Sequence, residues 1–449
     1  MLNYFSRKER LIAFLLVAIV LIYIGWRSIS SPEQAMQFGF NGLSVGAVYA
    51  LMAIGFTLVY STVWFFDLYY GAAAALGAYG VFYLRSQEWL GGQYQVNTPV
   101  VNIILALVVA GVAAWVLHAI LYSRLRERVD PTTLRIVGGL LAIALGAYTG
   151  LVLTFPSHLH VTFGPVAALI VGVAAIWGLR LLFERLNGGR GHLAFQAIAV
   201  LIGAALAIYI GIFLVNSPGS KLYLSWAVSC LIAGTVGLAL YRGLYVRMRQ
   251  RSRSPLIMLV ASLGILLALT ACISIVFQSA PRPLPDPFGS VPWTIGGANI
   301  KGFNFFAIGV AIVGFLALLS VLKWTSFGRA VRAIGDDEEV ARVVGINTTV
   351  IIAIVFFVGA AFAAMAGILS GHDTAIQPRM GLLLMLKGWI ASVVGGIGNL
   401  YGAILGGFML GLIEQFAIWD LAGEWKDVVA FGLLILFLSF WPRGLLPRK

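Results

Sequence analysis

The chain alternates between long apolar runs and short polar segments. Many runs reach about 20 residues with few or no charges, which is the length of a helix that crosses a bilayer. The pattern therefore predicts an all-α polytopic transmembrane protein with about 12–14 helices. After a first apolar run within 1–26, the expected spans are 36–60, 64–84, 98–123, 134–154, 162–183, 193–215, 222–246, 255–278, 303–323, 350–371, 383–396, 401–417 and 428–441.

Two of these runs differ from ordinary spans. The first follows Arg7, Lys8 and Arg10, as in a signal peptide, but no small-residue cleavage site follows it. We interpret it as an uncleaved span. The run 383–396 is short for a crossing helix, and we predict that it is re-entrant or broken.

Glycines are concentrated around the short run. The text GGIGN at 395–399 does not follow a strand, so it indicates close helix packing or a chain break rather than a phosphate-binding loop. Gly402/Gly406 and Gly407/Gly411 have the small-x-x-x-small spacing that allows two helices to approach closely.

The longest polar interruption in the second half of the chain is SFGRAVRAIGDDEEVARVVGINTT at 326–349. Here a short helix is predicted over 336–345. Asp336 is a suitable N-cap, and Glu339 three residues later completes a capping-box pattern. Gly345 is expected at C′, just beyond the last helical turn.

The predicted short helix has two different faces. Asp337 and Glu338 place negative charge in its first turn, where the helix macrodipole favours it. Val340, Val343 and Val344 fall at i, i+3 and i+4, so one face is apolar. A helix of about two turns is too short to cross the bilayer. We therefore expect it to dock into another protein.

Charge supports the membrane assignment and gives an orientation. Only 10% of the 449 residues are charged and 60% are hydrophobic, whereas soluble proteins carry about 25% charged residues. The net charge of +13 lies in alternate loops, which predicts that these loops, the short helix and both termini are cytoplasmic, with no nucleic-acid partner. The basic run at 247–254 is expected to contact anionic membrane lipid. The cations of these loops are Arg7, Lys8, Arg10, Arg124, Arg126, Arg128, Arg185, Arg190, Arg247, Arg249, Arg251, Arg253, Arg329, Arg332, Arg342, Arg443, Arg448 and Lys449.

Enzyme chemistry has no support in the sequence. There is no G-x-x-x-x-G-K-[ST] motif, so no P-loop for ATP is expected. No cluster of Cys, His and Asp has metal-ligand spacing, and Cys230 and Cys272 lie inside apolar runs, so no disulfide framework is implied. We expect neither a catalytic site nor a cofactor or metal in this chain.

Three blocks carry a resemblance to a known family. Glu339, Ala341 and Gly345 have the spacing E-x-A-x-x-x-G, which resembles the EAA loop of ABC-importer permeases. The segment around it, FNGLSVGAVYALMAIGFTLVY at 40–60 and SVVGGIGNLYGAILGGFMLGLIEQF at 392–416 resemble permeases of branched-chain amino acid importers, of the LivH type. The resemblance implies an ABC-importer permease-like core with an ATPase-coupling helix made of Asp336, Asp337, Glu338, Glu339, Val340, Ala341, Val344 and Gly345.

This resemblance also implies a function and partners. The chain would be the permease of an ATP-driven importer in a bacterial inner membrane, working by alternating access. A second related permease, as homodimer or heterodimer, cytoplasmic ATP-binding subunits that hold the ATP, and an extracytoplasmic solute-binding protein would complete the assembly. The alternative is a stand-alone secondary carrier or channel driven by an ion gradient, which would work without ATPase subunits. A scaffold that transports nothing is a third interpretation.

The chain departs from the family pattern in two places. It reads DLYYG at 67–71 where the family commonly has N-F-A-H-G, which leaves open branched-chain amino acids or a related small polar solute, such as an amide or a urea-like molecule. Residues 98–215 hold about four more spans than the family pattern. The expected parts are an extra N-terminal span 1–35, the first part of the core 36–97, the inserted bundle 98–215 and the second part of the core 216–449.

A few polar residues within the spans are candidates for a substrate pathway. For Asn41, Ser44 and Tyr49, interhelical hydrogen bonding along a broken, Gly-rich segment is equally open. Asp67 also fits a helix N-cap. Lys387 and Glu414 lie at similar depth on neighbouring segments. Three interpretations are open for them: they form an ion pair, they extend separately to the outer interface, or they contact the solute. These candidates are Asn41, Ser44, Tyr49, Asp67, Lys387 and Glu414.

Overall fold

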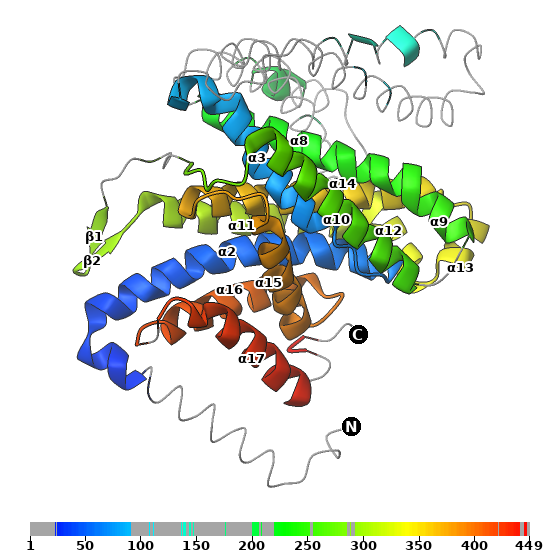
Figure 1. Ribbon diagram of the computed structural model, residues 1–449. Helices are drawn as coiled ribbons and strands as arrows, with labels where there is room; N and C mark the ends of the chain where they lie inside the picture. The colour runs from blue at the N-terminus through cyan, green and yellow to red at the C-terminus, as the bar shows by residue number, and fades with distance from the viewer. Residues whose placement is uncertain are drawn as a thin grey trace. The chain divides into compact units, whose positions relative to one another are not determined.

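The computed structural model of the chain describes residues 25–90, 220–251, 255–284, 292–420 and 422–440, together with isolated positions elsewhere (Figure 1). The chain divides into two compact units, one of Met1–Tyr79 with Ser229–Lys449 and one of Gly80–Val228. Most of the first predicted span and of the spans predicted between 98 and 215 lies outside the described residues.

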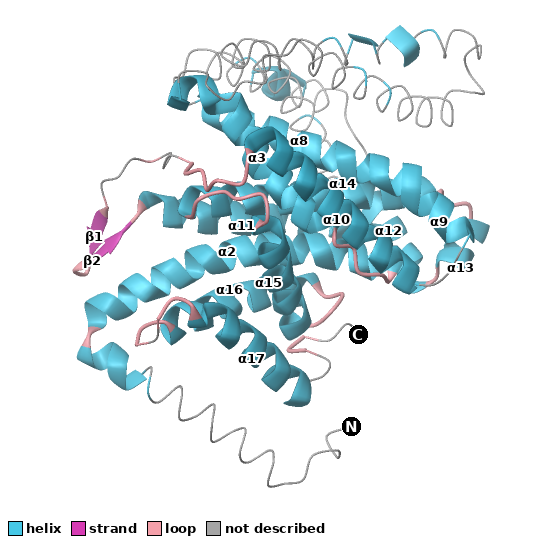
Figure 2. Ribbon diagram, in the orientation of Figure 1, coloured by secondary structure: helices cyan, strands magenta, loops and turns pink. Residues whose placement is uncertain are grey.

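Helices make up most of the described chain (Figure 2). Six of them are long and apolar enough to cross a membrane, which agrees with the prediction of an all-α polytopic protein. The described helices are α2 (Pro32–Val63), α3 (Tyr69–Leu90), α8 (Ser220–Leu240), a π-helix (Tyr241–Tyr245), α9 (Val246–Arg251), α10 (Pro255–Phe277), α11 (Gly302–Trp324), α12 (Ser326–Asp336), α13 (Glu338–Val343), α14 (Thr348–Asp373), α15 (Met380–Gly395), α16 (Leu400–Ala417) and α17 (Trp425–Phe440).

Helix α2 lies at the centre of the first unit and contacts α11, α14, α15 and α16. It begins with Pro32 at its first turn, where the missing N–H costs no hydrogen bond. It ends at Trp64, which adopts φ +57° and donates its backbone N–H to the carbonyl of Tyr60. The prediction of a broken segment here was wrong. The helix is continuous because neighbouring helices pack directly against its glycines.

The glycine pairs of α16 produce the closest packing. A Cβ atom on Gly407 would meet the Ala50 backbone at 2.4 Å, and one on Gly411 would meet the Gly46 backbone nitrogen at 2.3 Å. Gly402 and Gly406 face α15 in the same way, against Gly395 and Ala391. Both small-x-x-x-small predictions are confirmed, with one pair facing each neighbouring helix.

Helix α15 is a short apolar helix of 16 residues, as the sequence predicted. It ends at Gly396, where φ is +117°, and Asn399 caps the following α16 by accepting a hydrogen bond from the Tyr401 N–H. Leu445 and Leu446 donate their N–H groups to the carbonyls of Val394 and Gly395. GGIGN is therefore a tight turn between two packed helices.

The β-hairpin between α10 and α11 was not anticipated. Strands β1 (Trp293–Ile295) and β2 (Ala298–Ile300) form an antiparallel hairpin in which Trp293 pairs with Ile300. Gly296 and Gly297 both have positive φ, as a two-residue type I′ turn requires. The turn lies against the N-terminal end of α2, while α12 contacts the other end of that helix, so the hairpin and α13 lie at opposite ends of the unit (Figure 1).

Candidate functional site

The polar interruption folds as two helices, α12 and α13, separated by one residue. Asp337 has extended backbone angles, and its side-chain Oδ1 accepts hydrogen bonds from the N–H groups of Glu339 at 2.8 Å and Val340 at 3.0 Å. The predicted N-cap, Asp336, is the last residue of α12, so that prediction and the capping box with Glu339 were wrong by one position. Asp337 is the cap because its backbone is not helical, which places its carboxylate next to the free N–H groups of the first turn.

The other end of α13 was predicted correctly. Gly345 has φ +91° and follows the C-cap Val344. The N–H of Ile346 donates to the Ala341 carbonyl at 3.0 Å and that of Gly345 to the Arg342 carbonyl at 3.1 Å. This pair of bonds is a Schellman motif, which satisfies carbonyls that the end of the helix would otherwise leave free.

The apolar face of α13 points away from the protein. Val343 is 87% exposed, Val344 76% and Val340 58%, whereas Ala341 on the other face is buried. Solvated helices rarely present three adjacent aliphatic side chains. We define Val340, Val343 and Val344 as the valine face.

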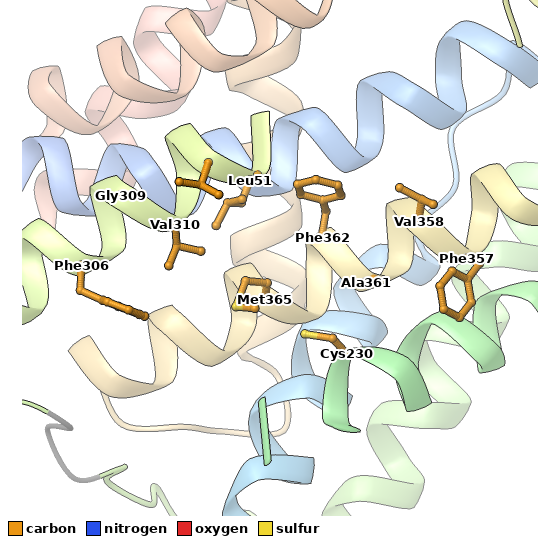
Figure 3. A pocket seen from close by; sticks show the side chains of 12 residues that line it. Leu51, Cys230, Phe306, Gly309, Val310, Phe357, Val358, Ala361, Phe362 and Met365 are labelled. Atoms are coloured by element: carbon orange, nitrogen blue, oxygen red, sulfur yellow. The ribbon is translucent and has the colours of Figure 1, made fainter. Parts of the chain in front are cut away.

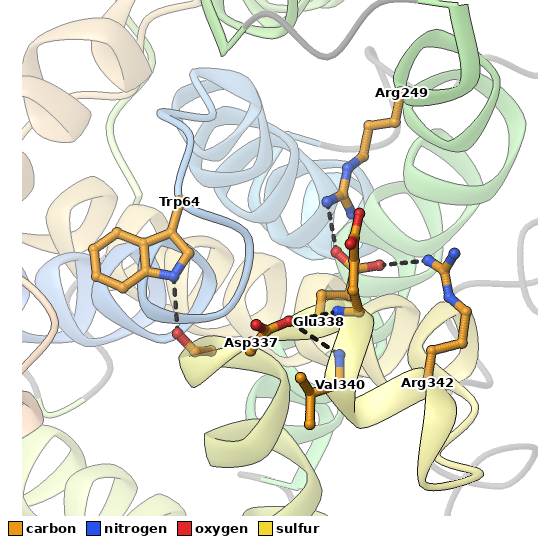
Figure 4. Close-up of polar contacts among 8 residues, drawn as sticks. Trp64, Arg249, Asp337, Glu338, Val340 and Arg342 are labelled. Atoms are coloured by element: carbon orange, nitrogen blue, oxygen red, sulfur yellow. Dashed lines mark hydrogen bonds and ion pairs between the residues drawn. The ribbon is translucent and has the colours of Figure 1, made fainter.

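Two polar contacts hold this segment to the rest of the unit, and a third lies within α13 (Figure 4). Glu338 accepts from Arg249 of α9 at 2.6 Å through Oε2, and from Arg342 of its own helix at 3.1 Å through Oε1. Trp64 Nε1 donates to the Gly335 carbonyl at 2.9 Å, at the end of α12. Sequence reasoning missed Arg249 and Trp64. Arg249 was assigned with its neighbours to lipid headgroups, and no local pattern links it to Glu338, 89 residues away.

A second cluster joins three of the pathway candidates. Lys387 Nζ lies 3.2 Å from Glu414 Oε2, and Tyr49 Oη donates to the same oxygen at 2.7 Å. Lys387 also lies 3.0 Å from Asp427, which sequence analysis missed. The side chains of Lys387 and Glu414 are only 12% and 1% exposed. The two residues form an ion pair, and separate extension to the interface is excluded.

The remaining candidates do not join this cluster. Asn41 accepts a hydrogen bond from the side chain of Asn304 at 2.8 Å, and Ser44 is buried on the same helix. Asp67 follows the far end of α2, roughly 20 Å beyond Tyr49 along the helix axis. Its Oδ1 accepts from the N–H of Tyr69 at 3.0 Å, as the N-cap interpretation predicted, and also from the hydroxyl of Tyr245 at 2.7 Å.

An apolar groove of about 640 Å³ lies between α11 and α14 (Figure 3). Phe306, Val313, Phe357 and Phe362 line it, together with Leu51 of α2. Its lining offers no charged side chain to orient a zwitterionic or strongly polar solute, and removing such a solute from water without polar partners is costly. We therefore do not assign the groove to a transported amino acid.

Apolar spanning helices around α2, with a capped helix exposed at one end, define a polytopic membrane protein of the transport-permease class. Residues 193–438 match the sequence model of the family described as "Branched-chain amino acid transport system / permease component", and the chain belongs to that family. Its members are permease subunits and not themselves enzymes. No solved structure matches the chain.

Several relatives are similar over most of their own length. The high-affinity branched-chain amino acid permease LivH of Escherichia coli K12 is 33% identical over 299 residues, which cover 64% of this chain and 93% of LivH. BraD of Pseudomonas aeruginosa is 32% identical with the same coverage. The xylose permease XylH of Haemophilus influenzae is 26% identical over 67% of this chain and 81% of XylH. This chain is thus longer than LivH and BraD, which is consistent with an insertion.

Proposed function

We propose that this chain is the membrane-spanning subunit of an ATP-driven importer for branched-chain amino acids. ATP is bound and hydrolysed by partner subunits that dock on α13, and this chain itself holds no cofactor. The support for the transport class comes from family membership. The observation that carries the coupling role is the valine face, exposed on a helix that is capped at both ends and held to the unit by Glu338.

The docking role follows from the energetics of the valine face. Fully burying one valine side chain is worth about 1.5–3 kcal/mol, so covering three partly exposed ones contributes several kcal/mol to an interface. The rigid caps mean that little conformational entropy is lost when the helix enters a cleft. A short helix of this kind transmits force along its axis without bending.

The proposed orientation puts α12 and α13 in the cytoplasm, because the cations of α9, α12 and α13 are gathered at this end of the unit (Figure 1). The β1–β2 hairpin then faces the outside, on the side of an extracytoplasmic solute-binding protein. A second related permease, identical or different, completes the transmembrane pathway. Lipid headgroups cover the basic end of α9.

The proposed solute is a branched-chain amino acid, since the relatives at 32–33% identity carry that description. Weaker relatives have other solutes, as the xylose permease illustrates. The DLYYG departure at 67–71 makes a related small polar solute, such as an amide or urea-like molecule, the second candidate. A competition experiment distinguishes the two candidates: uptake of labelled leucine is measured with an excess of unlabelled branched-chain amino acid or of an amide or urea-like molecule.

The coupling role is tested by a substitution in the tight turn after α13. Gly345→Asp should abolish solute uptake and ATPase co-purification while membrane insertion stays normal. No neighbouring atom lies within 4 Å of a Cβ added at Gly345, so a side chain there meets no clash and adds only the backbone strain of φ +91° and, for aspartate, a charge at the docked surface. Gly345→Asn is the matched control, because asparagine tolerates positive φ without adding charge.

The outcomes separate the two classes of transporter. Uptake that needs the ATPase subunits, and is lost in Gly345→Asp but retained in Gly345→Asn, supports the importer. Uptake by the chain without ATPase subunits would support the ion-driven carrier. Normal uptake and co-purification in Gly345→Asp would refute docking at α13.

A further inference from the structure

The connector between α2 and α3, residues 64–68, is held by three different elements. Trp64 donates to the end of α12, as described above. The N–H of Leu68 donates to Ser262 Oγ of α10 at 3.1 Å. Asp67 accepts from Tyr245, the last residue of the π-helix, at 2.7 Å. A displacement of any of these elements therefore reaches the connector.

One segment of the chain contacts both the connector and the docking helix. Tyr245 and Arg249 are four residues apart on a continuous helical segment, so their side chains lie on the same face. Tyr245 contacts Asp67 at one end, and Arg249 contacts Glu338 of α13 at the other. Both ends are polar contacts of 2.7 Å or less, which fix direction as well as distance.

The interior end of this path is fully buried. Tyr245 is 0% exposed and Asp67 1%. Phe65 of the connector packs edge-on against Tyr245 at 5.4 Å, and Phe356 of α14 packs against both rings. Among the described residues, Asp67 Oδ2 has no hydrogen-bond partner. Because a buried carboxylate needs its few donors, Asp67 must follow the Tyr245 hydroxyl if that group moves.

The π-helix ends at Tyr245, so it directly precedes the turn of α9 that joins the two contacts. Its wider turn is rare and is found mostly as single turns at functional positions. A change from π to α geometry would alter the register of the residues that follow, Tyr245 and Arg249 included, and would give the segment a second discrete arrangement. Coupling between distant sites requires such a two-state element.

We propose that Arg249 and Tyr245 form a relay that carries movement of the docking helix α13 to Asp67 at the head of α3. The inference rests on the proposed function, in which α13 receives the ATPase movement. Arg249 and Tyr245 are positioning residues: they contact neither ATP nor solute, and they act through Glu338 and Asp67. Trp64 gives the same connector a second contact with the α12 end.

The first experiment needs no partner protein. Hydrogen–deuterium exchange of the full chain in detergent measures the opening of the amides of Leu68 and Tyr69. Arg249→Gln should raise their exchange rate roughly two- to fivefold, as expected for loss of a part-buried ion pair, and Arg249→Lys should restore it. Arg251→Gln is the matched control, since Arg251 is exposed at the end of the same helix and lies outside the contacts described above. Unchanged exchange in Arg249→Gln would overturn the relay.

The second experiment measures coupling in the complete importer, reconstituted in vesicles. Arg249→Gln and Tyr245→Phe should each retain ATPase co-purification and ATP hydrolysis but lower solute moved per ATP by about fivefold or more. Because both substitutions interrupt the same path, the double variant should lose no more coupling than the more severe single variant. Multiplying effects would mean independent structural roles and would overturn the relay.

These outcomes remain distinct from failure of the proposed function. If no ATPase subunit co-purifies with the unaltered chain, the importer assignment fails, and the exchange experiment alone decides whether Arg249 controls the connector. If ATPase subunits co-purify and uptake per ATP is normal in Arg249→Gln, the importer assignment stands and the relay fails.

Discussion

The buried cluster on α15 and α16 places one cation between two acids. Glu414 is buried, accepts from Tyr49 and Lys387 through a single oxygen, and has no partner for Oε1 among the described residues. Lys387 has a second acid in Asp427, whose side chain is 48% exposed. The two partners therefore depend on each other unequally. Loss of Lys387 leaves Glu414 without a cation, whereas loss of Glu414 leaves Lys387 paired with Asp427.

This asymmetry gives a prediction at the scale of single residues. Lys387→Met should destabilise the protein by about 3–5 kcal/mol, since it leaves a buried carboxylate unpaired. Glu414→Gln should cost less, and the double variant should be more stable than Lys387→Met alone. Thermal unfolding in detergent measures all three. Additive effects of the two single substitutions would mean that the ion pair has no energetic role.

At the scale of elements, α16 is held between α2 and α15 by backbone contacts. Glycine has no Cβ, so it lets the two helix backbones approach closely and gain dispersion energy. This energy matters in lipid, where no hydrophobic effect drives helices together. The same close approach means that a larger residue is not tolerated at these glycines, because the neighbouring backbone atoms cannot move to another rotamer as a side chain can. At these glycines the contact between α2 and α16 thus depends on residue size.

The corresponding prediction uses the same substitution at two glycines. Gly411→Ala should lower the folded yield and cost at least about 1–3 kcal/mol, because its Cβ would lie 2.3 Å from the Gly46 nitrogen. Gly432→Ala on α17 is the control. No atom lies within 4 Å of a Cβ there, so alanine should be neutral or stabilise by about 0.5–1 kcal/mol. Equal melting temperatures for the two variants would contradict the close-packing account.

At the scale of the whole molecule, the chain combines a permease core with additional residues. LivH aligns over 93% of its own length with only 64% of this chain. The predicted insertion at 98–215 falls inside the second unit, Gly80–Val228, and lies mostly outside the described residues. An even number of inserted spans leaves the orientation of everything after it unchanged.

A deletion tests this organisation. Joining Asn97 directly to Ser217 should leave Lys449 on the cytoplasmic side, because the same number of spans is removed in each direction. Reporter fusions at Lys449, compared between the deleted and the full chain, measure the orientation. An external reporter in the deleted chain alone would refute the even span count.

Local sequence patterns determined much of the fold. The apolar runs predicted α10, α11, α14, α15 and α16 within a few residues, because a backbone in lipid must satisfy its hydrogen bonds within its own helix. The valine face and the Gly345 cap were also predicted, since side chains three or four residues apart and a single positive φ are local properties. These signals act within about one helical turn and need no knowledge of distant neighbours.

Only the tertiary structure decided the rest. Asp336 and Asp337 are equivalent as caps by sequence, and the backbone angles that packing imposes selected Asp337. Glycines in α2 suggested a break, but α16 and α14 fill the space beside them and the helix continues. Glu338 with Arg249, and Glu414 with Tyr49, are pairs separated by 89 and 365 residues. Such pairs depend on which helix faces meet, and a periodic pattern in one segment contains no information about the segment packed against it.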